Sequence, residues 1–449
     1  MSGIAGIAAQ GRQSTVQLML DKMAHRGGAD RAVFEAEGAT LGIVRPRGQA
    51  LLPLKLGEAV EDYVGDGHFV EARVVHGELN LFRDPLGVSP LYYGRTPQGT
   101  VCFASEVKAL LGVAHDLAEF PPGHRFAGGY TEPYEGRAES PPPFHGSPDM
   151  LAAELRHVLA WAVRKRLRSE VAGAWLSGGL DSSTMAALVR PHVRLLHTFV
   201  AGVAGAPDLE YARQVAEHLG SRHHEVLVTL DRMLAALPKV IYHLESFDAL
   251  LVRSSIANYL VAKVASDFVP EAFSGEGGDE LFAGYHYLKA LPKEQLAGEL
   301  IDITNRLHNT ALQRVDRCAA AHGLVAHVCF LDPNVVEYAM RIPTRLKLRD
   351  GVEKWILRRA MAGTLPEQVL ARPKAKFWEG AGVGEMLAEH SDETVSDADF
   401  SHERTLPNGW LINTKEELMY YRLFKEHFGA LEDLAWMGRT KGAPVSLSL

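Results

Sequence analysis

The segment from Trp175 to Ser183, WLSGGLDSS, limits the fold of this 449-residue chain more than any other part of it. The apolar run 171–176 leads into adjacent glycines, and residues 182–189 have the composition of a helix that begins at the turn. Adjacent glycines let backbone N–H groups approach an anion, and a helix N-terminus adds a partial positive charge. The segment therefore predicts a strand, a phosphate-binding loop and a helix.

The loop also has the side chains that a pyrophosphate group needs. Its serines supply hydroxyl donors, whereas Asp181 would repel a bare phosphate and is best explained by a Mg²⁺ ion that bridges the carboxylate and the phosphates. A tight turn that needs glycine only for its backbone angles is the alternative, but the flanking serines and aspartate favour phosphate binding. The candidate loop residues are Ser177, Gly178, Gly179, Asp181, Ser182 and Ser183.

Residues 131–148 divide the chain, because they are rich in proline and glycine and have no periodic apolar face. Short alternating apolar runs before this linker predict a sheet-rich domain at 1–130. After it, residues 149–167 have apolar side chains at helical spacing, and strand-like runs then alternate with helices. This alternation predicts a mainly parallel sheet, covered on both faces, within a domain at 149–449. The strand-like runs are 171–176, 195–203 and 271–274.

Composition excludes several classes of protein. The formal net charge of −8 argues against a nucleic-acid partner, because such proteins usually have a basic excess. Cys102, Cys318 and Cys329 form no CxxC pair, which excludes a disulfide scaffold and a cysteine zinc site. No apolar run has the length of a membrane span and the N-terminus lacks the pattern of a signal peptide, so we expect a cytoplasmic protein.

A second glycine-rich segment, residues 273–285 with the sequence FSGEGGDELFAGY, narrows the family. The SGGLDSS loop resembles the signature of the N-type ATP pyrophosphatases, and residues 273–285 resemble asparagine synthetase within that superfamily. Further matching motifs follow in the family order through the C-terminal domain. They are PDL at 207–209, HHE at 223–225, SFD at 246–248, FLD at 330–332, KWILR at 354–358, RPK at 372–374 and NTKEE at 413–417.

The resemblance implies that a carboxylate attacks the α-phosphorus of ATP, that pyrophosphate leaves, and that an amine then displaces AMP from the acyl-adenylate. Asp181 and Asp279 would hold Mg²⁺. Lys374 would stabilise charge at the reacting phosphate, with a solvated place in the charged run 372–376 as the alternative. Glu276 would orient the substrate or accept a proton from the amine, with a structural ion pair as its alternative. The resemblance also implies an AMP site lined by Leu176, Ala201, Ser274 and Gly275.

The N-terminal half resembles the glutaminase domain of these enzymes. The resemblance implies a shortened Ntn-hydrolase-like α+β sandwich, followed by a doubly wound parallel-sheet ATP pyrophosphatase domain. The family's nucleophile is an N-terminal cysteine where this chain has Ser2, and a hydroxyl is a weaker nucleophile than a thiol unless a base activates it. The family's glutamine-gripping Asn-Gly-Glu segment is also missing between Leu41 and Val88, so we expect no glutamine hydrolysis. The matching residues are 2–6, 25–27, 83–93 and 103–108.

The expected substrate pocket departs from the family as well. After Asp248 the family has two threonines before its arginine, whereas this chain has Leu250 and Leu251 before Arg253. Arg253 would still pair with a carboxylate, but leucines cannot replace hydroxyl donors around a small polar amino acid. Either the acid is less polar than aspartate, which we favour, or the leucines only repack a wall and aspartate is still used. The expected pocket residues are Asp248, Leu250, Leu251, Arg253 and Glu276.

These features predict an ATP-dependent ligase that joins a small carboxylic acid to ammonia or another amine, with ATP and Mg²⁺ as cofactors. The ammonia would be free or come from a separate glutaminase, and a homodimer, frequent in the family, stays open. Two other functions also stay open. One is a ring-closing amide synthetase of specialised metabolism, and the other is a non-catalytic protein that binds nucleotide. We expect neither a nucleic-acid nor a membrane partner.

Overall fold

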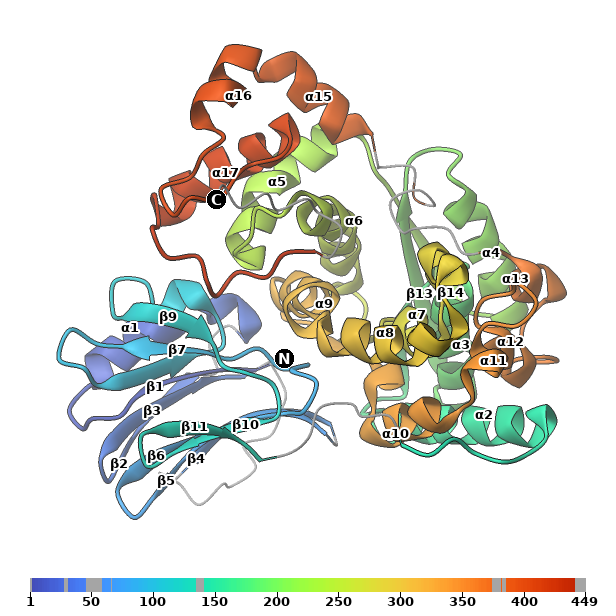
Figure 1. The fold of residues 1–449 in the computed structure, drawn as a ribbon, viewed down its shortest axis with the longest axis horizontal. Coiled ribbons are helices and arrows are strands. Elements are labelled where there is room, and N and C mark those ends of the chain that lie inside the picture. The colour runs from blue at the N-terminus through green and yellow to red at the C-terminus, as the bar shows by residue number, and fades with distance from the viewer. Residues whose placement is uncertain are drawn as a thin grey trace.

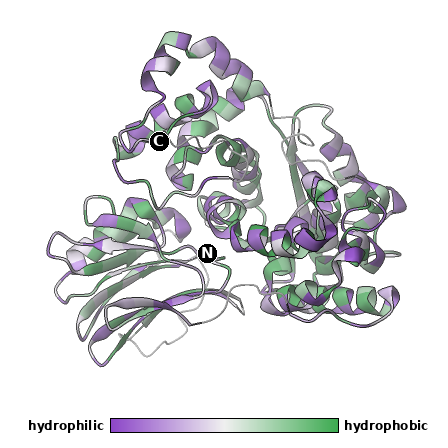
Figure 2. Ribbon diagram, in the orientation of Figure 1, coloured by the Kyte–Doolittle hydropathy of each residue, from purple (hydrophilic) through white to green (hydrophobic). Residues whose placement is uncertain are grey.

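The structure is a computed structural model that describes residues 2–27, 31–45, 59–65, 67–134, 141–373, 381 and 385–440. The chain forms two antiparallel sheets in its N-terminal part and one parallel sheet in its C-terminal part (Figure 1). Figure 2 shows hydrophobic residues concentrated along the strands of these sheets. None of the described helices is long and apolar enough to cross a membrane.

The two N-terminal sheets pack face to face around one core. One has the strand order β2-β3-β1-β8-β7-β9 and the other β11-β10-β6-β5-β4. Because successive side chains of a strand point to opposite faces, Ile4 packs with Leu41, Leu81 and Phe103 in a core shared by the two sheets, whereas Ala5 belongs to the core that includes the first helix. The elements are β1 (Gly3–Ile7), α1 (Gln13–Lys22), β2 (Arg31–Ala36), β3 (Ala39–Val44), β4 (Ala59–Gly65), β5 (His68–Val75), β6 (Glu78–Arg83), β7 (Tyr92–Arg95), β8 (Val101–Ala104), β9 (His115–Glu119), β10 (His124–Ala127) and β11 (Tyr130–Pro133).

The C-terminal sheet is parallel throughout, and helices cover it (Figure 1). Its strands are β12 (Val171–Trp175), β13 (Leu195–Gly202), β14 (Arg222–Leu227), β15 (Glu271–Phe273) and β16 (Val325–His327). The helices are α2 (Pro148–Arg164), α3 (Leu180–Val189), α4 (Pro207–Leu219), α5 (Leu230–Leu244), α6 (Ala249–Ala265), α7 (Gly278–Phe282), α8 (Lys293–Asn305), α9 (Ala311–Ala320), α10 (Pro333–Arg341), α11 (Thr344–Lys347), α12 (Trp355–Ala360), α13 (Glu367–Ala371), α15 (Met386–Thr394), α16 (Asp397–Glu403) and α17 (Lys415–Phe428).

The strand order of the parallel sheet, β14-β13-β12-β15-β16, reverses between β12 and β15. From β12 the chain moves outward through β13 to β14, and it then returns to the other side of β12 as β15. In open α/β sheets, the carboxyl ends of the strands at such a reversal form the usual ligand-binding crevice. The two glycine-rich segments of the sequence follow β12 and β15, so the topology brings both of them to this crevice.

The predicted fold class is confirmed. The strand-like runs at 171–176, 195–203 and 271–274 are strands β12, β13 and β15, each within one residue of the expected bounds. Helix α2 begins at Pro148, where the Ser147 hydroxyl accepts a hydrogen bond from the backbone N–H of Met150. The strand–loop–helix unit around the glycines is also present, as β12 and α3.

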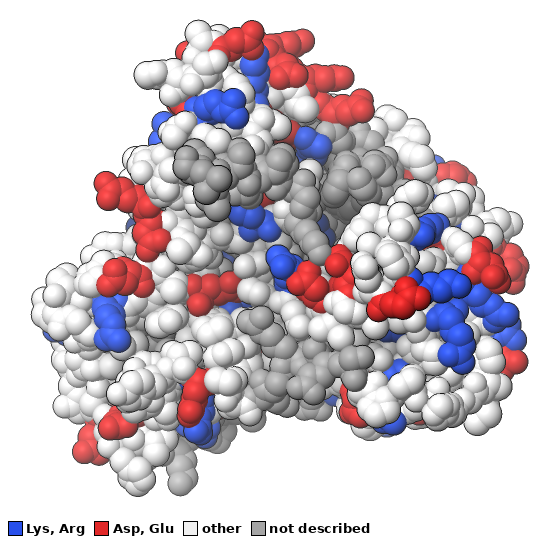
Figure 3. Space-filling model, viewed as in Figure 1, with Lys and Arg blue, Asp and Glu red and all other residues white. Residues whose placement is uncertain are grey.

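The domain boundaries stay a prediction. Strand β11 ends at Pro133 and pairs with β10, so the last strand of the N-terminal sandwich extends into the predicted linker 131–148. Residues 135–140 of that linker lie outside the described residues. On the face seen in Figure 3, Lys and Arg side chains are interspersed with Asp and Glu.

Candidate active site

Two glycine-rich loops meet at the reversal point of the parallel sheet. A Cβ atom on Gly275 would lie 2.8 Å from the backbone nitrogen of Ser182, so the second loop can approach the start of α3 only because it has a glycine there. Gly178 has a φ of +69°, and a Cβ at this position would lie 2.4 Å from the Cβ of Tyr211. Both glycines are therefore required by the backbone path, which is a local property that the sequence signals.

A cavity of about 1000 Å³ opens at this point. Of the predicted nucleotide-binding residues, Gly178 and Ser183 do not line it, because Gly178 packs on Tyr211 and Ser183 is fully buried in α3. The other predicted loop and AMP-site residues do line it, so the structure brings together segments that lie about 100 positions apart. The lining members of the predicted set are Leu176, Ser177, Gly179, Asp181, Ser182, Ala201, Ser274, Gly275, Glu276 and Asp279.

Hydrogen bonds between the serines hold the first loop in its conformation. The hydroxyl oxygens of Ser177 and Ser182 lie 3.0 Å apart, and the Ser182 hydroxyl accepts from the Ser177 backbone N–H at 3.2 Å. The Ser177 hydroxyl accepts from the N–H of Gly179 at 3.3 Å. Gly179 is the N-cap of α3, whose orphan N–H groups therefore begin at the cavity. The loop thus combines ordered hydroxyls with a helix N-terminus, the combination that binds phosphate.

Lys354 is a cavity residue to which the sequence interpretation gave no role. Its ammonium group forms ion pairs with both Asp181 and Asp279, and the residue is almost fully buried. Lys354 adopts a φ of +55° immediately before α12, and its backbone N–H donates to the carbonyl of Phe282. The KWILR match at 354–358 was the signal that could have identified it. The two carboxylates predicted to bind a cation therefore already converge on one positive charge.

Arg372 is a second cation that the sequence interpretation missed. Its guanidinium donates to the carbonyl of Ser177 at 3.0 Å and to the carboxylate of Asp208 at 2.5 Å, and it lies over the ring of Tyr211. It ties the phosphate loop to α4 and lines the cavity. Lys374, the predicted catalytic lysine two positions further on, lies outside the described residues.

The far end of the cavity contains Glu276, which forms an ion pair with Arg314 of α9. Arg314 also donates to the hydroxyl of Ser254 at 3.0 Å. Leu250 and Leu251 both line this end, so they are part of the pocket surface. The pocket here joins one ion pair to an apolar wall, which suits a ligand with a charged or polar group on a less polar body.

Glu280, which also lines the cavity, adds a titratable group beside Asp279. Burial raises its pKa to about 7, and the neighbouring carboxylate of Asp279 contributes in the same direction. The hydroxyl of Tyr285 donates a hydrogen bond to Glu280. This carboxyl group is thus able to exchange a proton near neutral pH.

Arg253 and Asp248 do not take the places predicted for them in the substrate pocket. The guanidinium of Arg253 pairs with both carboxylate oxygens of Glu416 in α17, and it does not line the cavity. Asp248 is fully buried, caps α6 by accepting from the N–H of Leu251 at 2.9 Å, and accepts from the hydroxyl of Thr440 at 2.8 Å. In this structure neither side chain lines the cavity, and the substrate-binding role of Arg253 and Asp248 stays a prediction. Arg314 does line the cavity, where it pairs with Glu276.

Two family models match the chain. The model described as asparagine synthase matches residues 154–310 and 293–443, and the model described as a glutamine amidotransferase domain matches residues 58–120. The chain is 36% identical to asparagine synthetase [glutamine-hydrolyzing] 2 of Arabidopsis thaliana over 377 residues, which cover 77% of this chain and 64% of that protein. It is 33% identical to the probable asparagine synthetase [glutamine-hydrolyzing] of Dictyostelium discoideum over 401 residues, or 80% of this chain and 72% of that protein.

Solved structures are less similar. NMN synthetase from Francisella tularensis aligns with 64% of this chain and 98% of its own, at 14% identity and a TM-score of 0.29, which is too low to carry an argument.

Proposed function

This chain belongs to the asparagine synthase family, and we propose that it is an ATP-dependent ligase that forms an amide through an acyl-adenylate. The observation that carries the proposal is the meeting of the two glycine-rich loops at the sheet reversal, with Asp181, Asp279 and Lys354 between them. A cavity with a phosphate loop at one end and an ion pair in an apolar wall at the other suits the joining of a nucleotide to an organic acid.

The loop and its neighbours would bind ATP. Backbone N–H groups of the loop and the hydroxyls of Ser177 and Ser182 would face the phosphates. Leu176, Ala201 and the second loop at 274–275, which also line the cavity, would enclose the adenosine. Lys354 and Arg372 add two fixed positive charges at the phosphate end. Positive groups in this place stabilise the negative charge that grows on the phosphates as the α-phosphorus is attacked.

Asp181 and Asp279 fit a bound Mg²⁺. Mg²⁺ in nucleotide sites is usually held by one or two carboxylates and the substrate phosphates, and these two carboxylates already converge on one cation. When bound, Mg²⁺ neutralises phosphate charge and orients the leaving pyrophosphate. The ammonium of Lys354 would hold the two carboxylates near one point before the nucleotide arrives.

Glu276 is the candidate group for the second half-reaction. Its ion pair with Arg314 fixes the carboxylate at the acyl end of the cavity, where it would orient the incoming amine or accept its proton. We also propose that Lys374, two positions after Arg372 in the sequence, stabilises the reacting phosphate.

The acid that we propose is less polar than aspartate. Leu250 and Leu251 stand where the family has threonines, and both are at the pocket surface. This favours an apolar pocket over the repacking of a remote wall. A site without those hydroxyls loses hydrogen bonds to a small polar amino acid and gains contact with a larger apolar acid.

The nitrogen donor that we propose is free ammonia or another amine. Ser2 replaces the family's cysteine, it is buried, and its carbonyl accepts a hydrogen bond from Arg26 at 3.1 Å. The Asn-Gly-Glu segment that grips glutamine in the family is missing from the sequence. The free, buried Cys102, Cys318 and Cys329 suit a reducing cytoplasm.

The proposal is tested by incubating the protein with ATP, Mg²⁺ and a panel of carboxylic acids that includes aspartate, with ammonium or with glutamine. We expect pyrophosphate, AMP and an amide with ammonium and a larger apolar acid, and no amide when glutamine is the nitrogen source. Asp279→Asn is the matched loss-of-function control. Turnover of aspartate as the best acid would contradict the substrate assignment, and activity with glutamine would contradict the donor. If no acid supports the exchange of pyrophosphate into ATP, the non-catalytic alternative, a protein that only binds nucleotide, would be favoured.

A further inference from the structure

The segment that forms the acyl end of the cavity is held at two points by the N-terminal domain. This segment runs from Leu307 through α9 to Ala320. We propose that Glu119 and Glu106 of the N-terminal domain are positioning residues for acid binding, because they set the place of this segment and so of Arg314. This proposal rests on the proposed function, because the acid is the substrate of the proposed ligase. It gives the N-terminal domain a role that does not depend on glutamine.

The first point of attachment is Glu119, at the end of β9. One carboxylate oxygen lies 2.7 Å from Nδ1 of His308, and the other accepts from the side-chain amide of Asn309 at 3.3 Å. Arg83 donates to the same carboxylate at 2.8 Å. Although burial opposes ionisation, the guanidinium of Arg83 and the ring of His308 lower the pKa of Glu119 to about 2. Glu119 is therefore a fixed anion that grips the turn before α9.

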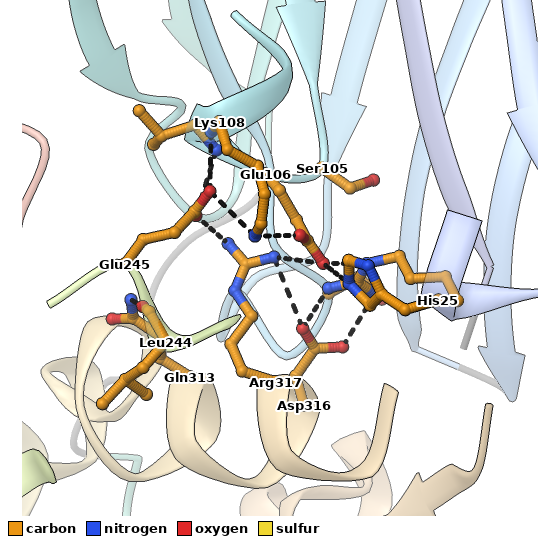
Figure 4. Close-up of polar contacts among 12 residues, drawn as sticks. His25, Ser105, Glu106, Lys108, Leu244, Glu245, Gln313, Asp316 and Arg317 are labelled. Carbon is orange, nitrogen blue, oxygen red and sulfur yellow. Dashed lines mark hydrogen bonds and ion pairs between the residues drawn. The ribbon is translucent and has the colours of Figure 1, made fainter. Parts of the chain in front are cut away.

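The second point of attachment is a buried charge cluster, of which Figure 4 labels Glu106, Glu245, Asp316 and Arg317. Arg26 belongs to the same cluster through its ion pairs with Glu106 and Asp316. Arg317 of α9 lies 2.9 Å from Glu106 and 3.0 Å from Glu245. Arg26 donates to the carboxylate of Asp316 at 3.2 Å. Breaking one partner of a buried ion pair is costly, because the other charge stays buried. The cluster therefore permits little sliding of α9 against the N-terminal domain.

The two attachments act on residues that form the cavity wall. The residues of the held segment that line the cavity are Leu307, His308, Asn309, Thr310, Ala311 and Arg314. His308 and Asn309 are thus both gripped by Glu119 and exposed to the pocket. Arg314 lies one helical turn before Arg317 and reaches Glu276. Displacement of α9 by a fraction of a helical turn would separate Arg314 from Glu276, the group that we place beside the amine.

At the phosphate end of the cavity, we find no comparable contact from the N-terminal domain to the loop among the described residues. Its polar contacts, Ser177–Ser182, Lys354–Asp181 and Arg372–Asp208, all lie within the C-terminal part of the chain. Loosening of the domain interface is therefore expected to weaken binding of the acid and to leave binding of ATP nearly unchanged. A purely structural interface would instead affect both ends equally, through global stability.

The test uses the full chain with Glu119→Gln, and Glu132→Gln as the matched control. Glu132 is in the same domain, is exposed and pairs only with the strand neighbour Arg125 among the described residues. Hydrogen–deuterium exchange, measured without any ligand, is expected to be about tenfold faster across residues 307–320 in Glu119→Gln and unchanged in the control. The Michaelis constant of the best acid of the panel is expected to rise about tenfold, with that of ATP within about twofold.

A second variant guards against a global effect. Arg317→Lys keeps the charge but loses the forked geometry that reaches Glu106 and Glu245 together, so it should show the same pattern more weakly. Unchanged exchange at 307–320, or equal rises in the constants of acid and ATP, would overturn the inference. If the unsubstituted protein turns over no acid, the proposed function fails. Hydrogen–deuterium exchange across residues 307–320 still tests whether Glu119 positions the segment.

Discussion

The ammonium nitrogen of Lys354 lies 2.5 Å from a carboxylate oxygen of Asp279, and it also pairs with Asp181. The three side chains come from three segments: the start of α3, the start of α7 and the residue before α12. Each is a known kind of phosphate-site group, and their meeting places two carboxylates around one ammonium group. A nucleotide that arrives with its cation can replace part of this pairing without leaving a buried charge unpaired.

Lys354→Ala is therefore expected to impair the phosphate end of the site. Removal of one fixed charge near a reacting phosphate typically costs about 10²–10³-fold in rate. Pyrophosphate exchange into ATP measures the effect, and Lys289→Ala is the control, because Lys289 pairs with Glu353 and does not line the cavity. Exchange at the normal rate in Lys354→Ala would show that the lysine only balances charge in the empty site.

Leu250→Thr combined with Leu251→Thr is expected to shift the acid preference toward aspartate. The hydroxyls would supply donors at the pocket wall and remove apolar contact, and such changes are worth about 1–3 kcal/mol in discrimination. The ratio of kcat/KM for aspartate to that for the best apolar acid should rise at least tenfold. Conservative replacement by valine, which keeps the wall apolar, should leave that ratio nearly unchanged.

Arg253→Ala is expected to destabilise the fold and to spare the chemistry. The carboxylate of Glu416 would stay buried with only the hydroxyl of Tyr420 as a described side-chain partner, at 2.6 Å. The loss of one partner of a buried pair costs about 3–5 kcal/mol. Urea unfolding should report this loss, while kcat/KM at a temperature where the variant is folded should change less than threefold. A large fall in kcat at full folding would restore the substrate-binding role first predicted from the sequence.

His68 gives the protein a pH-dependent stability. It is buried, with Nε2 2.8 Å from the carbonyl of Leu331 in the turn before α10, and burial together with the charge of Arg166 lowers its pKa from 6.5 to about 3. Between these values the unfolded chain binds a proton that the folded protein excludes, so stability falls as the pH falls from 6.5 toward 3. His68→Gln should remove about 2 kcal/mol of the loss between pH 6.5 and 4.5. If the free energy of unfolding depends on pH in the same way in both proteins across this range, His68 is not the group responsible.

The local features of the site could be predicted from the sequence. Gly178 and Gly275 are needed for backbone geometry within a few residues, and the strands around them have simple apolar patterns. Leu250 and Leu251 were expected in the pocket from their place after a matched motif, and both line the cavity. These properties depend on residues that are close together in the chain, so the local sequence pattern is enough to predict them.

The partners of charged groups could not be predicted in this way. Arg253 was assigned to a substrate, but its partner is Glu416, 163 positions away, and no periodicity links the two. Arg314 was overlooked because nothing in its neighbourhood marks it, and only the packing of α9 against the cavity brings it to Glu276. Whether an arginine serves a ligand or a neighbouring carboxylate is decided by tertiary packing.

The charge cluster between the domains also bears on how such a chain can evolve. A deletion of the N-terminal domain would remove Arg26, Glu106 and Glu119 in one step, and it would leave Asp316 without Arg26 and Arg317 without Glu106. A lineage that lost the domain would have to replace several of these contacts. Selection on the C-terminal half therefore also acts on the face of the N-terminal sandwich that it contacts, independently of any chemistry that the sandwich carries out.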